Sequence, residues 1–184
     1  FRRVLFRSLR APRVGLFSHL NTVADLVEIS INCFRLQLLV FTLRKETMDV
    51  LLIIGRVLFS LIFISSGLSH LTKVEAMSGY AQFKKVPAPK VAVIVTGLMI
   101  VIGGLYIALG VYADLGGLLL AIFLLATAFM MHNFWTIQDP QAKQNEMISF
   151  MKNLALAGAA LIIFVVVGSG GNFGPSITSH FFNL

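Results

Sequence analysis

Seven polar or aromatic side chains lie beside the ends of the apolar stretches of this chain: His70, His132, Asn133, Trp135, Glu146, Lys152 and Asn153. The two histidines can change charge near neutral pH, so they can pass protons to a small molecule such as a quinone. Their ring nitrogens can also bind haem iron or a metal ion. The carboxylate of Glu146 can take part in proton transfer as well.

The same side chains also have plainer explanations. A tryptophan such as Trp135 near a membrane boundary is most often an interfacial anchor, and Lys152 can extend its amine to the lipid headgroups. Histidines at the carboxyl ends of helices are favoured by the helix dipole. Three interpretations therefore stay open: interfacial side chains, a proton or quinone site, and a haem or metal site, which is disfavoured because no third ligand is evident.

Arg56 is a charge inside an apolar stretch, six residues from its start at Val50. At 1.5 Å per helical residue it lies about 9 Å deep. A charge at that depth costs a few kcal/mol unless it finds a partner. Asp49 and Asp114 belong to the same membrane face, so we expect Arg56 to form a structural ion pair with Asp114 or Asp49; ligand binding by Arg56 is the alternative.

Four apolar stretches must position these residues, at about residues 50–71, 91–111, 114–131 and 151–167. The first would reach about 33 Å as a helix, which matches the hydrocarbon core of a bilayer. Hydrophobic residues make up 57% of the chain and charged residues 12%, with a mean hydropathy of +0.86. A soluble protein would need helices with polar outer faces, whereas residues 91–108 are apolar on all sides. The sequence predicts four transmembrane helices.

The connections between these stretches predict an all-α fold, an antiparallel four-helix bundle in the membrane. The link around Asp114 is so short that the second and third helices must be antiparallel neighbours. In such a bundle the carboxyl ends of the first and third helices share one membrane face with the amino ends of the second and fourth. The candidate site residues therefore gather at one face, together with Lys84 and Lys85 from a loop.

The positive charge of the chain lies mostly before Met48. Eight of the fifteen lysines and arginines precede it, which argues against a nucleic-acid partner for the remainder. The opening FRRVLFRS resembles spurious translation of sequencing-adapter DNA. We therefore treat residues 1–47 as an N-terminal extension, non-native or disordered and in part helical, and residues 48–184 as the membrane domain.

Membrane orientation follows from the lysines of the two long loops. After Met48 these loops contain six lysines, whereas the opposite side has only Arg56. The positive-inside rule then places both long loops in the cytoplasm and both ends of the domain outside.

Cysteine usage limits the possible chemistry. The only cysteine, Cys33, precedes Met48. Residues 48–184 therefore cannot carry out dithiol exchange, hold an iron–sulfur cluster through thiolates or attach a c-type haem. Without a clear cofactor motif either, we do not expect an independent enzyme.

From Met48 to about Gly168 the chain resembles the DoxX family of small bacterial membrane proteins. The resemblance depends on five features in the family's order: GRVLFSLIFISSGLSHL (residues 55–71), VPAP (residues 86–89), the Gly103–Gly104 pair followed by Gly110, HNFW (residues 132–135) and QNEMISFMKNLAL (residues 144–156). The family pattern often has a glutamate three residues before the double glycine, where this chain has Ile100. Any role of that carboxylate must be absent here or fall to Glu146.

The resemblance implies a four-helix protein of the bacterial inner membrane. Some relatives are subunits of quinone-reducing sulfur oxidoreductases or of membrane complexes that handle oxidative stress. One hypothesis is an accessory subunit that binds a quinone or anchors a soluble or membrane oxidoreductase partner. The other is a non-enzymatic membrane protein that binds or transports a small molecule or maintains membrane properties. A homo-oligomer is compatible with both.

Overall fold

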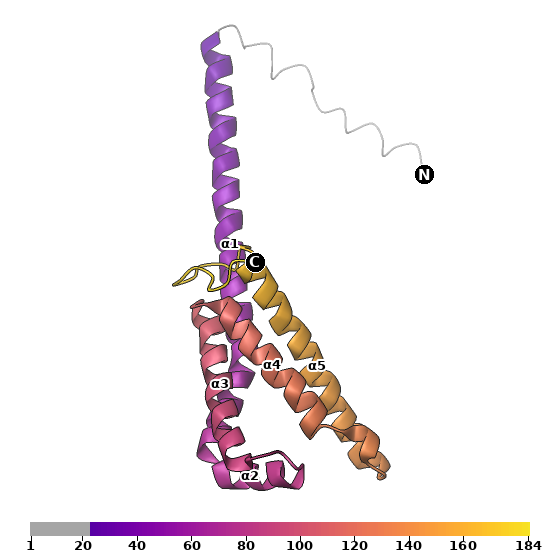
Figure 1. Cartoon of the computed structure of the whole chain (residues 1–184). Helices are drawn as coiled ribbons and strands as arrows, with labels where there is room; N and C mark the ends of the chain where they lie inside the picture. The colour runs from indigo at the N-terminus through magenta and orange to yellow at the C-terminus, as the bar shows by residue number, and fades with distance from the viewer. Residues whose placement is uncertain (1–22) are drawn as a thin grey trace, which may run out of the picture. The chain divides into compact units, whose positions relative to one another are not determined.

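The computed structural model describes residues 23–184, with side chains from residue 27 onward, and every regular element in this range is helical. The elements are α1 (Val23–Thr72), α2 (Val74–Phe83), α3 (Pro89–Leu109), α4 (Ala113–Met131), the short 3₁₀ helix η1 (Phe134–Thr136) and α5 (Pro140–Gly168) (Figure 1). The prediction of an all-α fold is confirmed. Predictions for residues 1–22, the arginine-rich start of the extension, fall outside the described residues.

The chain divides into two units between Thr47 and Met48, inside α1. We had expected the first helix to begin near residue 50, whereas α1 begins at Val23. Polar residues such as Glu28 and Arg35 do not interrupt it, because such side chains on an exposed helix cost little helical propensity. The fold and the candidate site described below belong to residues 48–184.

Four of the helices, α1, α3, α4 and α5, are long and apolar enough to cross a membrane, as predicted. Local signals define their ends. Gly110 ends α3 with a positive φ of 67°, a conformation that glycine adopts without strain. Asp139 begins α5 by accepting a 2.7 Å hydrogen bond from the amide of Ala142, and Pro140 occupies the first helical turn.

Three helical segments lie where the sequence predicts loops: α2, η1 and the first turns of α5. The connection after α1 contains α2, which buries only Ser78 and Ala81, one turn apart. This pattern is too short to distinguish a ten-residue helix from a loop. The fourth spanning helix also begins earlier than expected, at Pro140 instead of about residue 151.

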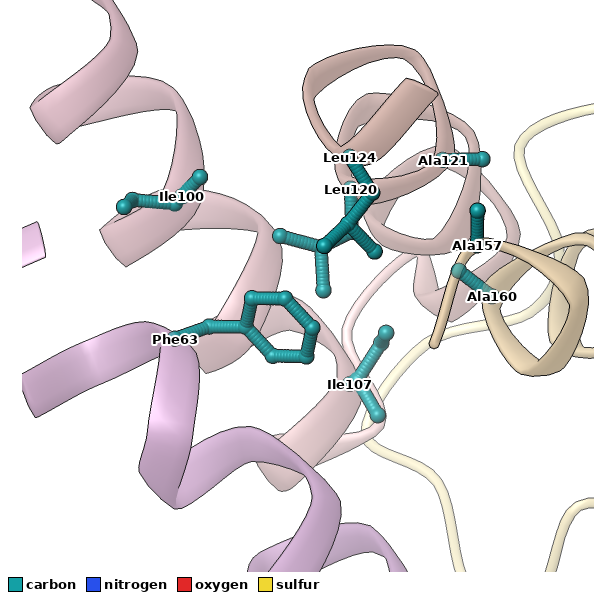
Figure 2. Close-up of a cluster of buried hydrophobic side chains, with 8 residues drawn as sticks. All are labelled: Phe63, Ile100, Ile107, Leu120, Ala121, Leu124, Ala157 and Ala160. Carbon is teal, nitrogen blue, oxygen red and sulfur yellow. The ribbon is translucent and has the colours of Figure 1, made fainter. Parts of the chain in front are cut away.

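The core of residues 48–184 lies where the four spanning helices meet (Figure 2). It consists of apolar side chains from each of them: Phe63, Ile100, Ile107, Leu120, Ala121, Leu124, Ala157 and Ala160. Ala121 lies beside Ala157 and Ala160 where α4 meets α5 (Figure 2). Close approach of the helices is general here, since a Cβ atom on Gly117 would lie 2.7 Å from the carbonyl oxygen of Ala160.

Large apolar side chains cover the outer surface of these helices. Leu58 on α1 and Ile162 on α5 are each 65% exposed. In water such a surface would be unfavourable, whereas lipid chains solvate it. The described helices are therefore suited to a bilayer.

The segment after α5, residues 169–184, runs back across the ends of the helices, and we call it the strap (Figure 1). The amides of Ile177 and Thr178 donate to the carbonyl oxygen of Gly110 at 3.0 and 3.3 Å. The amide of Leu184 donates to the carbonyl oxygen of Gly168 at 3.0 Å. The apolar stretches of the sequence do not predict this arrangement.

Candidate functional site

A polar cluster forms where α2, α4 and α5 come together, and we call it the loop-face cluster. Its members are Tyr80, Lys84, His132, Asn133 and Glu146. Tyr80 belongs to α2 and Lys84 caps its end, His132 caps the end of α4, and Glu146 lies two turns into α5. Helix ends and loops at one end of the bundle therefore bring together residues up to 66 positions apart.

A histidine–carboxylate pair occupies the centre of the cluster. The Nδ1 atom of His132 lies 2.7 Å from the Oε2 atom of Glu146, and the two side chains are each 22% exposed. The hydroxyl of Tyr80 donates to the other carboxylate oxygen, Oε1, at 3.3 Å. Glu146 therefore has a partner at each oxygen.

Lys84 ties α2 to the other side of the cluster. Its Nζ atom donates to Oδ1 of Asn133 at 3.0 Å and lies 4.0 Å from Oε1 of Glu146. Only 11% of its side chain is exposed, and its ammonium lies 5.7 Å from the centre of the Tyr80 ring. A cation so close to a carboxylate and an aromatic face stabilises the negative charge of the cluster.

The surroundings of Tyr80 keep its phenol protonated. Burial raises the pKa of the Tyr80 hydroxyl, and the negative charge of Glu146 and the hydrogen bond to it raise the pKa further. A neutral phenol is required for the donated hydrogen bond. Tyr80 therefore stays a donor to Glu146 above the pH at which an ordinary tyrosine ionises.

The geometry leaves one nitrogen of His132 available. When Nδ1–H donates to Glu146, the carboxylate orients the ring and Nε2 is an acceptor in the neutral ring and a donor in the protonated ring. The pair can therefore accept and return a proton at Nε2.

Not all the predicted site residues join this cluster. Nδ1 of His70 lies 3.3 Å from the Thr96 hydroxyl, and its ring packs edge-on at 6.1 Å against Phe123 inside the bundle. Lys152 is exposed, and Asn153 is buried on α5 without a bond to the cluster. Of the seven predicted residues, His132, Asn133 and Glu146 come together.

Trp135 belongs to a neighbouring aromatic group. Its ring packs against Phe134 and Phe150 at centroid distances of 5.3 and 5.9 Å, and it is 53% exposed. Phe150 lies one helical turn after Glu146 on α5. The aromatic group therefore adjoins the loop-face cluster.

Tyr80 is not among the predicted site residues. The sequence predicts a loop at residues 72–90, and a loop assigns no common face to its side chains. A signal was present, because an aromatic residue four positions before Lys84 shares a helical face with it.

The expected ion pair of Arg56 with Asp114 or Asp49 does not form. Among residues 27–184, no carboxylate lies within 4.0 Å of the Arg56 guanidinium. Arg56 is 5% exposed and donates instead to four backbone carbonyls, at Ile107, Ala108, Phe173 and Pro175. Carbonyls in the last turn of a helix lack the usual amide partner four residues on, so they can accept from the guanidinium. The carbonyl of Ile107 also accepts the amide of Gly110 at 3.3 Å.

Asp114 also has backbone partners. Its Oδ2 atom accepts hydrogen bonds from the amides of Phe181 and Phe182 at 2.7 and 2.6 Å. The residue is fully buried, and Oδ1 has no hydrogen-bond partner among the described residues. The strap thus supplies two of the four hydrogen bonds of Arg56 and both hydrogen bonds of Asp114.

In the part of the chain that the structure describes, no three His, Cys, Asp or Glu side chains gather to hold a metal ion. Ile100, three residues before the Gly103–Gly104 pair, is fully buried in the apolar core. The carboxylate nearest a histidine is that of Glu146.

Comparison with known proteins places the chain in a family. The DoxX family model matches residues 51–133. The inner membrane protein YphA of Escherichia coli is 31% identical over 121 residues, which cover 66% of this chain and 85% of the relative. The inner membrane protein YqjF of Escherichia coli is 29% identical over 126 residues, which cover 68% and 90%. No solved structure matches the chain. With this coverage and four membrane-spanning helices, the chain is a multi-pass membrane protein that belongs to the DoxX family.

Proposed function

We propose that this protein is an accessory subunit of a quinone-linked redox system in the bacterial inner membrane, without independent catalysis. The observation that supports it is the half-buried pair of His132 and Glu146, joined at 2.7 Å at one end of a lipid-suited bundle. The location follows from the two relatives, which are inner membrane proteins.

The residues around the pair fit a quinone headgroup. Such a headgroup is a flat ring with oxygen atoms that need hydrogen-bond partners, and it reaches its site from within the bilayer. Nε2 of His132 offers the hydrogen bond, and the rings of Phe134, Trp135 and Phe150 offer an aromatic surface next to it.

The chain's own contribution is proton transfer and orientation. Glu146 holds Nδ1 of His132, Tyr80 and Lys84 hold the carboxylate, and Nε2 exchanges a proton with the bound ring oxygen. A quinone supplies the two-electron chemistry when bound. We assign proton transfer to the loop-face cluster and electron transfer to a partner oxidoreductase.

Trp135 provides a direct test, because it is the only tryptophan of the chain and adjoins the cluster. Its fluorescence would be recorded in lipid nanodiscs during titration with a short-chain ubiquinone analogue. We expect saturable quenching, and an apparent affinity at least about tenfold weaker in His132→Ala and Glu146→Gln, because a charge-assisted hydrogen bond contributes about 1.5–3 kcal/mol.

His180→Gln is the matched control, since it removes another histidine from the opposite end of the bundle. It should leave quenching unchanged. Equal quenching in His132→Ala and wild type would remove the site assignment. Quenching that never saturates would favour the non-enzymatic alternative, a protein that binds or transports another small molecule or maintains membrane properties.

A further inference from the structure

We infer that Arg56 and Asp114 form a binding site for the main chain of the strap, which makes residues 169–184 a releasable cover on one end of the bundle. This end is opposite the loop-face cluster, because Asp114 lies at the start of α4 and His132 at its end. The 19 residues of α4 separate them by about 28 Å.

Arg56 forms one pole of this site and uses its donors in two directions. Its Nε and one terminal nitrogen donate at 2.9 Å to the carbonyl oxygens of Ile107 and Ala108, at the end of α3. The other terminal nitrogen, Nη1, donates to Pro175 at 2.7 Å and Phe173 at 3.2 Å, both in the strap. The Phe173 ring centre also lies 5.4 Å from the guanidinium carbon. Both hydrogen bonds donated by Nη1 are therefore to the strap.

Asp114 forms the other pole, with the opposite polarity. One carboxylate oxygen accepts two consecutive strap amides, those of Phe181 and Phe182. The second oxygen is buried and has no partner within the described range. Without the strap, the Asp114 side chain would therefore lose both of its hydrogen bonds.

Between the two poles the strap is bound to the link from α3 to α4. Gly110 accepts the amides of Ile177 and Thr178, and the Thr178 hydroxyl accepts the amide of Tyr112 at 2.8 Å. A Cβ atom on Gly110 would lie 2.7 Å from the Arg56 guanidinium and 3.0 Å from Ser176. The backbone of the strap therefore fits against the link between α3 and α4 because residue 110 has no side chain.

Most of the large apolar side chains of the strap are exposed: Ile177 is 71% exposed, Phe181 57% and Leu184 61%. Phe173, which packs against the core, and Phe182, whose ring centre lies 5.5 Å from that of Phe164, are partly buried. A segment held mainly by backbone hydrogen bonds, with few buried apolar contacts, opens at a lower free energy than the packed helices. When the strap detaches, Arg56 loses two hydrogen bonds and Asp114 loses both of its own. We therefore expect the strap to detach from the two residues together.

Hydrogen–deuterium exchange of the full-length protein in nanodiscs tests the inference, since the strap amides that bond to Gly110 and Asp114 should exchange more slowly than in an unstructured peptide. Arg56→Gln should accelerate exchange at Phe181 and Phe182 by about tenfold or more, although these amides bond to Asp114 and not to Arg56. Thr178→Val removes one hydrogen bond and should accelerate strap exchange by about fivefold.

Lys152→Gln is the control for loss of a cation, because Lys152 is exposed and lies outside the site; it should change nothing in the strap. Peptides from α4 and α5 report whether a variant stays folded. If Arg56→Gln unfolds the helices, the rate of strap exchange in Thr178→Val tests the inference in its place. Exchange of wild-type strap amides at the free-peptide rate would overturn the inference, as would a Thr178→Val protein with unchanged strap exchange. Faster exchange confined to residues 173–176 in a folded Arg56→Gln protein would also overturn the inference, because the strap would then detach from Arg56 without detaching from Asp114.

Discussion

Arg56 shows how a charge is accommodated inside an apolar bundle without an opposite charge. Its guanidinium has five N–H donors in a planar fork, which suits several carbonyl oxygens at once. Two carbonyls in the last turn of α3 supply two acceptors, and the strap supplies two more. The sequence could identify the need for a partner, but not a backbone partner, because carbonyls are present at every residue.

The stability effects of the two buried charges should be coupled through the strap. Arg56→Gln and Asp114→Asn each disturb hydrogen bonds to buried charges, so we expect each to destabilise the protein by about 2–4 kcal/mol. The double variant should lose less than the sum, because either single change already loosens the shared strap. Unfolding in mixed detergent micelles would measure this, and strictly additive losses would contradict it.

Tyr80 should ionise at a higher pH than an ordinary tyrosine. Its pKa is raised by burial and by Glu146, so stability from its neutral form is fully present below the ordinary tyrosine pKa and disappears as the pH rises through the raised pKa. Phenolate absorbance of wild type minus Tyr80→Phe isolates its titration from the other two tyrosines. Glu146→Gln should move the pKa back part of the way, because the contribution of burial remains. A titration unaffected by Glu146→Gln would contradict the assigned contact.

At the scale of elements, the spanning helices were predictable and the short connecting helix was not. The apolar stretches predicted α3, α4 and the second part of α1 because lipid requires long helices with satisfied backbones. The amino-terminal turns of α5 carried a start signal, Asp139–Pro140, although they lie outside the apolar stretch. The helix α2 had no such signal, since Lys73 makes no side-chain cap. Tertiary contacts through Tyr80 and Lys84 hold it in place.

Close packing of α4 on α5 should depend on Gly117. A methyl group there would lie 2.7 Å from the Ala160 carbonyl oxygen and 3.0 Å from the Phe164 amide nitrogen, both backbone atoms that cannot rotate away. We therefore expect Gly117→Ala to destabilise the protein by about 1–3 kcal/mol. Gly158→Ala is the matched control on α5, because nothing lies within 4 Å of its added methyl group. Thermal unfolding in detergent compares them, and equal melting temperatures would contradict the packing argument.

At the scale of the molecule, residues 48–184 have two polar ends and an apolar middle. One end has the loop-face cluster, and the other has Arg56 and Asp114 bound to the strap. The multi-pass membrane assignment is confirmed by the four spanning helices and the family. The cytoplasmic placement of the long loops, the oxidoreductase partner and any homo-oligomer stay predictions.

The amino-acid sequence by itself determined that the helices lie in lipid, that the fold is all-α and that the chain belongs to its family. It also determined the membrane face at which His132, Asn133 and Glu146 meet, because long apolar stretches and short links allow few arrangements in a bilayer. Only the tertiary structure decided which polar atoms touch. Tyr80 donates to Glu146 in the loop-face cluster, and His70 lies beside Thr96. Arg56 and Asp114 form hydrogen bonds with the strap and not with each other. The physical reason is that hydrogen bonds depend on ångström-scale geometry, whereas hydrophobic burial depends only on which stretches are apolar.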